Sequence, residues 1–158
     1  MILAGGSNPP REPAQRSPAA PAGAILLVVS QQNIELIQAW FERWNRDDRG
    51  FSADEELHPD FQVISRLQSE PFRGREGLRR WMEEIDEHFQ EWELVGEEWR
   101  DAGDRVAVVG HVRLRGKESG VGFDQPVGWL FEFKEGRLFR LRNFVRPEEA
   151  LEAAGLRE

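Results

Sequence analysis

The chain lacks both cysteine and tyrosine over its 158 residues. Without cysteine it can form no disulfide, thiolate nucleophile or cysteine-ligated zinc site, which suits a reducing compartment, and we expect a cytoplasmic protein. Its longest apolar run, residues 24–29, is far shorter than the roughly 20 residues that span a bilayer, so no membrane association is predicted. Basic residues are also few, 21 against 29 acidic ones, and the net charge of −8 disfavours binding to nucleic acid.

What the chain does contain is apolar bulk, with six tryptophans and ten phenylalanines. Proline is concentrated at the start, where residues 1–29 lack any hydrophobic period and are predicted to form a disordered arm. A cryptic secretory signal is the less favoured interpretation of this arm. A further hypothesis is that the arm is absent from the native protein, because the start of the chain was assigned too far upstream. Residues 30–158 are predicted to form one domain, which is long enough for a hydrophobic core.

Hydrophobic periodicity predicts helices first and strands later. Ser30 is expected to cap a helix whose apolar positions recur at helical spacing, and residues 52–55 to form a short helical turn. A second helix after Gly74 carries an apolar stripe from Leu78 to Trp92, and its charged side is interpreted as a solvated face. Strands are expected at residues 61–65, 94–99, 105–115, 122–133 and 137–145, with a final helix at 147–156. This order favours an α+β fold in which helices pack on one face of a curved sheet.

Several segments resemble the nuclear transport factor 2 superfamily, most closely its SnoaL-like and ketosteroid-isomerase-like branch. They are AWFERWNRDD, HPDFQVIS, SEPFRGREGLRRWM, DAGDRVAVVGHVRLRG and EGRLFRLRNF, spread over residues 31–156. The resemblance implies a cone-shaped α+β barrel, a curved mixed or antiparallel sheet wrapped around N-terminal helices with a pocket between them. It does not imply one activity, because this fold hosts isomerases, cyclases, hydrolases and non-catalytic binders.

The resemblance also places the catalytic positions of the isomerase members, and all three depart from the pattern. The tyrosine falls on Trp40, the aspartate base on Ser65 and the protonated aspartate on Trp129. Proton abstraction beside a carbonyl needs a general base and an oxyanion donor, and serine without a partner is no such base. The sequence therefore argues against steroid isomerisation.

Strand alternation, with Trp129 facing inward, predicts the lining of a pocket. The inward sets include Val127 and Phe133 on one strand, Phe139 and Val145 on the next, and Leu114 on the long strand. We expect a ligand-binding site for a small, largely apolar molecule. Its lining is predicted to be Trp40, Trp44, Ser65, Trp81, Val112, Trp129, Phe131, Leu141 and Asn143. The alternative is that these aromatic side chains fill the cone completely, as aromatic stripes often do.

The strand residues that point away from the predicted pocket are expected to form an interface between two subunits. His111, Arg113, Arg140 and Arg142 fall on the convex face, where members of this family commonly pair two subunits, so a homodimer is expected. A β-bulge near Gly110 would instead turn His111 into the pocket as an acid–base candidate. No metal spacing such as His-Glu-x-x-His occurs, and neither metal nor cofactor is expected.

Three functions remain open from the sequence. The first is a binding protein for a small apolar ligand that lacks the isomerase residues. The second is a cyclase- or isomerase-like enzyme with a divergent site, using His111 or the pair Ser65 and Asn143. The third is a non-catalytic dimeric interaction module.

Overall fold

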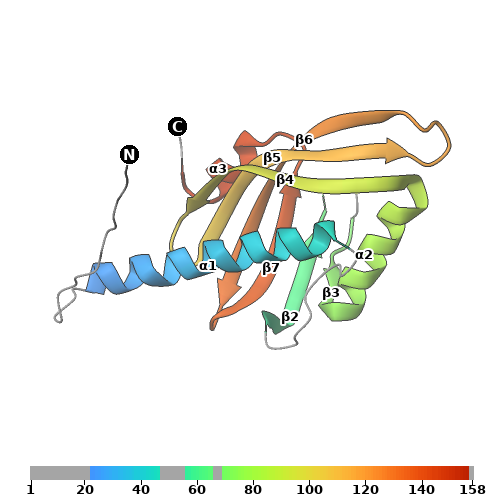
Figure 1. Ribbon diagram of the computed structural model, residues 1–158. Coiled ribbons are helices and arrows are strands. Elements are labelled where there is room, and N and C mark those ends of the chain that lie inside the picture. Colours follow the sequence, from blue (N-terminus) through green and yellow to red (C-terminus); the bar gives the residue numbers. More distant parts are fainter. Residues whose placement is uncertain (1–21, 47–55, 66–68, 157–158) are drawn as a thin grey trace, which may run out of the picture.

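The structure, a computed structural model, describes residues 22–46, 56–65 and 69–156, with side chains from residue 31 onward. Three helices and six strands follow one another along these described residues (Figure 1). They are α1 (Ala22–Asn45), β2 (Leu57–Ile64), β3 (Phe72–Arg73), α2 (Gly74–His88), β4 (Phe89–Asp101), β5 (Arg105–Gly116), β6 (Gly122–Lys134), β7 (Arg137–Phe144) and α3 (Glu148–Ala153).

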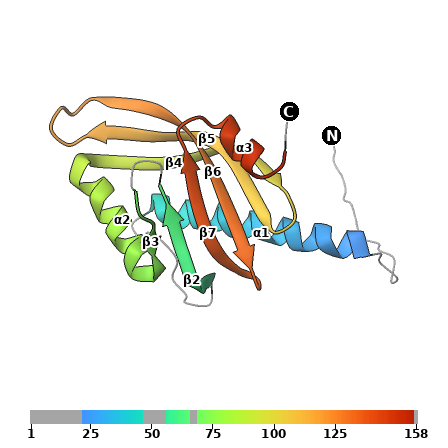
Figure 2. The same cartoon turned by 180° about the vertical axis from the view of Figure 1, so that it is seen from behind.

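All six strands belong to one curved, unclosed sheet with the order β3-β2-β7-β6-β5-β4. Strands β2 and β7 run parallel and the other neighbours run antiparallel. Helix α1 lies across one face of this sheet and the short α3 across the other (Figures 1 and 2). The predicted α+β class and its sheet wrapped around an N-terminal helix are confirmed.

The main core lies between α1 and the concave face of the sheet. Ile37, Trp40, Phe41 and Trp44 recur at helical spacing, and all are at most 4% exposed. They meet inward residues of the central strands, among them Val108, Trp129, Phe131 and Leu141. Helix and strand periodicity thus point the same large side chains into one cluster.

A smaller core lies on the convex face, where α3 packs against Ala107 and Leu130. Gly128 makes this approach possible, because a Cβ atom there would lie 2.7 Å from the carbonyl oxygen of Pro147 and 2.9 Å from Cβ of Ala150. Part of the convex face is therefore already covered by the chain's own last helix.

Two predicted helix boundaries are wrong. Helix α1 begins at Ala22, so Ser30 lies in the interior of the helix and not at its N-cap position. Helix α2 ends at His88, and Phe89 and Trp92, which were expected on its apolar stripe, begin the edge strand β4. Both residues are still inside or against the core, and this is why the helical pattern continues through them. The turn predicted at residues 52–55 lies outside the described residues, as do residues 1–21 of the arm predicted at 1–29, whereas residues 22–29 belong to α1. The domain boundary at residue 30 stays a prediction.

Strand alternation predicts most inward positions correctly, and the exceptions are one residue in a bulge and one beyond the end of a strand. Along β5 and β6 the register runs unbroken from Arg105–Glu132 to Arg115–Gly122. Between β6 and β7, Glu132 pairs with Arg140 but Phe133 pairs with Leu138. The residue between Leu138 and Arg140 therefore has no partner on β6. That extra residue is Phe139, and Leu138 faces the core in its place. Val145, also expected inside, follows the end of β7 and is 54% exposed.

Candidate functional site

Aromatic side chains occupy the deep part of the cone. Trp40 lies 4.8 Å from Trp44 and 5.5 Å from Phe131, measured between ring centroids, and both contacts are edge-on. Trp129 lies 5.1 Å from Phe41 and is 3% exposed. Edge-on pairs at these spacings are the packing that aromatic rings prefer in protein cores.

The other predicted lining residues of the deep pocket belong to the same cluster. Leu141 is fully buried, Trp81 packs 5.8 Å from Trp44, and Val112 is partly buried against them. The Nε1 atom of Trp44 is buried and donates no hydrogen bond to a described residue. In this region the packing agrees with the alternative in which aromatic rings fill the cone.

Ser65 and Asn143, the two polar residues of the predicted site, do come together. Their parallel strands pair Val63 with Leu141 and Ile64 with Arg142, so Ser65 and Asn143 come next in register. They border a cavity of about 370 Å³ beyond the end of the aromatic core. Asn143 also pairs with Trp129 across β6 and β7, and Trp129 is not among the residues that line this cavity.

The remaining lining of this cavity is almost entirely apolar. It comes from the start of β4, the outer parts of β5 and β6 and the end of β7, and comprises Phe89, Leu114, Phe123, Gln125, Pro126, Val127, Phe144 and Val145. Among the described residues that line it there is no carboxylate, lysine, arginine or histidine. The cavity can therefore accept an apolar molecule and offer hydrogen bonds, but its described lining supplies no group that titrates near neutral pH.

The sequence carried a signal for part of this lining. Leu114, Val127 and Val145 belong to the inward sets that alternation predicts, and Phe123 and Gln125 continue the phase of Val127. Phe89 could not be found because its helical spacing placed it on α2. What the sequence did not reveal is how far along the strands the aromatic core stops and the open space begins.

His111 stays on the convex face. The extra residue near Gly110 sits in β4, where Gly96 pairs with Gly110 and Glu98 with Val109, leaving Glu97 between them. Since β5 itself is regular, His111 points away from the core, and its Nδ1 atom lies 3.0 Å from Oε2 of Glu97. It is not among the residues that line the cavity.

The arginines of the convex face have acidic partners in the same chain. Glu132, a buried carboxylate, accepts hydrogen bonds from Nε of Arg140 and from Nη2 of Arg142, the latter at 2.9 Å. Arg113 lies 3.4 Å from Glu93 on the neighbouring strand. These side chains need no partner subunit to neutralise them, and the predicted homodimer stays a prediction.

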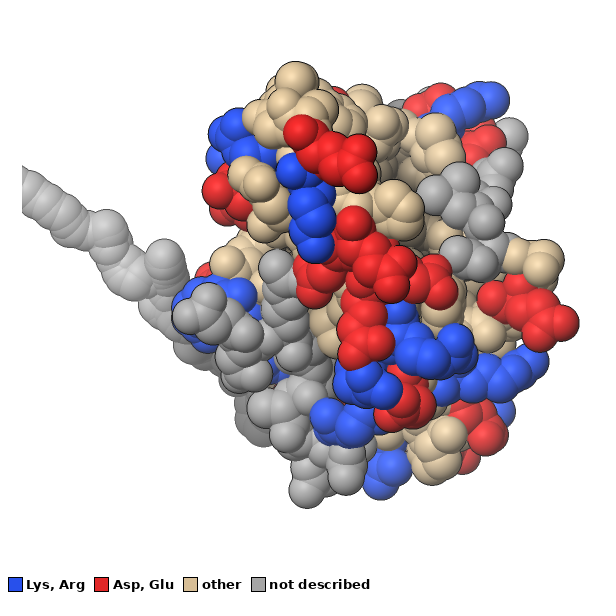
Figure 3. Space-filling model, turned by 90° about the vertical axis from the view of Figure 1, so that its right-hand side faces the viewer, with Lys and Arg blue, Asp and Glu red and all other residues tan. Residues whose placement is uncertain are grey.

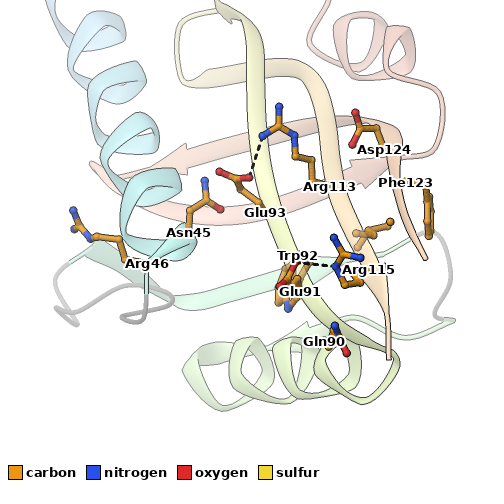
Figure 4. A pocket seen from close by; sticks show the side chains of 12 residues that line it. Asn45, Arg46, Gln90, Glu91, Trp92, Glu93, Arg113, Arg115, Phe123 and Asp124 are labelled. Carbon is orange, nitrogen blue, oxygen red and sulfur yellow. Dashed lines mark hydrogen bonds and ion pairs between the residues drawn. The ribbon is translucent and has the colours of Figure 1, made fainter. Parts of the chain in front are cut away.

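A larger hollow of about 700 Å³ crosses the edge strand β4 at the end of α1 (Figure 4). Its charged side chains face one another across the strands, with Arg115 3.2 Å from Glu91 and Arg113 paired with Glu93. Asn45 at its margin uses its amide to close the strand edge, since Nδ2 donates to the Leu94 carbonyl and Oδ1 accepts from the Leu94 N–H, both at 2.8 Å. These contacts stabilise the docking of α1 on the sheet, and they make this hollow a weaker ligand site than the apolar cavity.

Clear pKa shifts occur in two exposed surface pairs. The pKa of Glu76 is lowered by its hydrogen bond with Arg79 on α2, and the pKa of Glu148 is lowered by a backbone hydrogen bond and by Arg146. Neither pair lines the cavity. The side of the molecule shown in Figure 3 carries acidic and basic side chains next to one another, as expected for a solvated surface.

Two further features of the described residues bear on function. No described helix combines the length and apolar character that a membrane crossing requires. Within the same residues, no group of three or more His, Cys, Asp or Glu side chains is arranged to hold a metal ion.

Comparison with known proteins identifies the family. The family model of the SnoaL-like domain matches residues 37–141, about two thirds of the chain. The chain belongs to the SnoaL-like domain family. No curated protein is significantly similar to it in sequence. The resemblance to the nuclear transport factor 2 superfamily is confirmed.

Solved structures of this SnoaL-like domain's fold are numerous and distant in sequence. A protein from Jannaschia, provisionally named a SnoaL-like polyketide cyclase, is 24% identical, with a TM-score of 0.60 over 84% of this chain and 90% of that one. A nuclear transport factor 2-like protein of unknown function from Burkholderia pseudomallei is 17% identical, with a TM-score of 0.63 over 76% and 95%. A ketosteroid-isomerase-like protein from Catenulispora acidiphila, solved with trimethylamine, is 18% identical, with a TM-score of 0.61 over 77% and 93%. At these identities the similarity establishes the fold alone.

Proposed function

We propose that this SnoaL-like domain binds a small, largely apolar molecule in the cavity bordered by Ser65 and Asn143, and that it does so without acid–base chemistry. The observation that carries this proposal is the composition of the cavity. Its lining is apolar on most sides, with hydrogen-bonding groups at Ser65, Gln125 and Asn143, which is the usual make-up of a small-molecule site.

The enzyme alternative has less support in the geometry. Proton transfer needs a titratable group within hydrogen-bond reach of the substrate, and the described lining of the cavity has none. His111, the strand histidine considered for this role, lies on the opposite face beside Glu97. The provisional cyclase name of the Jannaschia relative supports catalysis only as an analogy of fold.

The rim of the cavity offers a direct test. Val145 lines the cavity and is 54% exposed, so Val145→Trp should obstruct the cavity with little effect on folding. We expect this variant to weaken binding of 2-naphthol, a neutral two-ring probe, at least tenfold in isothermal titration calorimetry at pH 7, a loss of about 1.4 kcal/mol.

Val121→Trp is the matched control, because Val121 is 60% exposed and does not line the cavity. It should leave the affinity for 2-naphthol unchanged. If the wild-type protein shows no binding, or if Val145→Trp binds as tightly as Val121→Trp, the proposed site is wrong. Multiple turnover of a ketone or polyketide substrate that survives combined substitution of Ser65 and Asn143 would also contradict it.

A further inference from the structure

We infer that the protein carries a second binding site, a small hollow beside the β6–β7 hairpin that takes a carboxylate attached to a single ring. Its lining comes from the β4–β5 turn, the end of β6 and the start of β7, and it combines cationic, acidic and aromatic side chains. None of these residues borders the apolar cavity, so the site is separate from the one in the proposed function.

The hollow carries more positive than negative charge. Arg105, Lys134 and Arg140 line it, and the acidic residues of its lining are Asp104 and Glu132. The chain as a whole is acidic, with a net charge of −8. A local excess of cations on an acidic protein attracts an anionic group to this position.

Two of the three cations keep hydrogen-bond donors for a ligand. Arg140 uses Nε for Glu132, and its Nη1 and Nη2 atoms donate to no described residue. Lys134 is exposed and forms no ion pair with a described residue. Arg105 is held at the margin, since its Nη1 atom donates to the Ala153 carbonyl at 3.1 Å. A guanidinium with free terminal nitrogens is the group that pairs best with a carboxylate.

Phe139 provides an apolar wall because of the bulge in β7. The bulge sets both Phe139 and Arg140 opposite Glu132, and Phe139 therefore lines the hollow instead of the core. The Nζ atom of Lys134 lies 4.9 Å from the centroid of the Phe139 ring, and Cζ of Arg140 lies 5.3 Å from it. One ring thus gathers two like charges, and an anion bound beside them would reduce their repulsion.

The turn of the hairpin keeps a neighbouring carboxylate away from Lys134. Glu135 has a left-handed φ of 56°, and its Oε1 atom lies 3.1 Å from Nε2 of His58 on β2. The N–H of Asp60 donates to Nδ1 of His58, so the neutral imidazole carries its proton on Nε2 and donates it to Glu135. Non-glycine residues in this conformation are uncommon and occur often at functional sites. Glu135 is thereby engaged with β2, and Lys134 stays available to a ligand.

The volume limits the ligand to one ring. The hollow measures about 200 Å³, and an apolar cavity of about 150 Å³ accommodates benzene. Phe133 and Phe139 offer carbon atoms to such a ring while its carboxylate meets the cations. A bare anion would leave these aromatic walls without contacts, and dispersion attraction acts only between atoms in contact.

The test is an NMR titration of the ¹⁵N-labelled full-length protein at pH 7 with benzoate, acetate and benzamide. Benzoate should shift the backbone amide signals of residues 133–140 in a saturable manner, about fivefold more tightly than acetate, which lacks the ring. Benzamide has nearly the shape of benzoate but no charge, and it should bind at least about fivefold more weakly than benzoate.

Variants assign the binding to this hollow. Lys134→Gln removes an exposed cation and should weaken benzoate binding about fivefold, as expected for the loss of a charge-assisted hydrogen bond. Lys117→Gln is the matched control, because Lys117 is the chain's other lysine, lies beyond the opposite end of β6 and does not line the hollow. Phe139→Leu should reduce the preference for benzoate over acetate.

The outcomes are independent of the proposed function. If benzoate leaves the signals of residues 133–140 unchanged, or if benzamide binds there as tightly, the carboxylate site is overturned. Equal benzoate affinity of Lys134→Gln and Lys117→Gln overturns it as well. Val145→Trp, which obstructs the apolar cavity, should bind benzoate at the hairpin as the wild type does, so either site can fail without the other.

Discussion

Glu132 shows how a single side chain organises the convex face of the sheet. Its side chain is 9% exposed and lies between Arg140 and Arg142, which are each about one third exposed. A carboxylate removed from water in this way is stabilised only by its two cations and their hydrogen bonds. Because the three residues sit on paired strands, their charges also hold β6 and β7 in register.

Glu132→Gln should therefore destabilise the fold more than a surface charge change does. The substitution leaves two neighbouring guanidinium groups without their shared anion, and we expect a loss of about 2 kcal/mol in the free energy of unfolding. Urea denaturation at neutral pH measures this loss. Glu93→Gln is the control, since its pair with Arg113 has both side chains about half exposed and should contribute less than about 1 kcal/mol. Equal effects of the two substitutions would show that the burial of Glu132 has no energetic consequence.

Trp129 shows what sequence reasoning can and cannot decide about one residue. Alternation along its strand correctly predicts that it faces inward, and the family pattern places it where isomerases keep an acidic donor. Whether its indole borders open space depends on Phe41 and Trp40, which come from a helix nearly ninety positions earlier in the chain. In the structure the indole belongs to the core, and Asn143 beside it borders the cavity.

Helix α1 illustrates the same limit for an element. Its apolar period predicts the buried positions from Ile34 to Trp44, all of which lie in or against the core. Its start was placed at Ser30 because serine is a favoured N-cap, yet the helix begins at Ala22. Local sequence supports both beginnings, since residues 22–29 contain alanine and leucine, which favour a helix as well.

Replacing Ser30 by alanine distinguishes the two beginnings. An N-cap serine contributes about 1 kcal/mol, so its loss would destabilise the domain. In the interior of a helix alanine is the better residue, and Ser30→Ala should be neutral or stabilising by up to about 0.5 kcal/mol. Urea denaturation, combined with the helical signal in circular dichroism, measures the difference. A decrease of about 1 kcal/mol in the free energy of unfolding would indicate that the helix begins at residue 30.

The sheet shows why strand phase is harder to predict than strand existence. Strands β5 and β6 lie within one residue of their predicted bounds, and their alternation is correct throughout. The errors lie at extra residues such as Phe139, whose place in a bulge depends on the pairing of two strands. Alternation within one strand carries no information about such pairing.

At the level of the whole molecule, the convex face is electrically balanced. Its carboxylates Glu93, Glu97 and Glu132 lie among the guanidinium groups of Arg113, Arg140 and Arg142, so three acidic charges accompany three basic ones. A face whose charges are balanced within one chain can pack against the same face of a second chain without like-charge repulsion. Such a pair of identical faces is related by a two-fold axis. We therefore propose that the chain forms a homodimer through this face.

Charge reversal tests this assembly. The wild-type protein should sediment as a dimer at micromolar concentration, and Arg113→Glu should raise the dimer dissociation constant at least tenfold, because it places acidic side chains together on both copies. Arg79→Glu, on the exposed face of α2, should leave the sedimentation coefficient unchanged. A monomeric wild type, or a dimer indifferent to Arg113→Glu, would contradict the proposal.

The amino-acid sequence was sufficient for the α+β class, the family and the inward-facing residues of the long strands, because these follow from local periodicity and from motifs within single segments. It also predicted Ser65 and Asn143 as polar lining residues, and both border the cavity. Tertiary packing was needed to show that Trp40, Trp44 and Trp129 pack together in the core, that His111 faces outward and that a cavity lies at the ends of β2 and β7. Each of these features depends on how side chains from segments distant in the sequence pack against one another. The pattern of residues within a single segment carries no information about that packing.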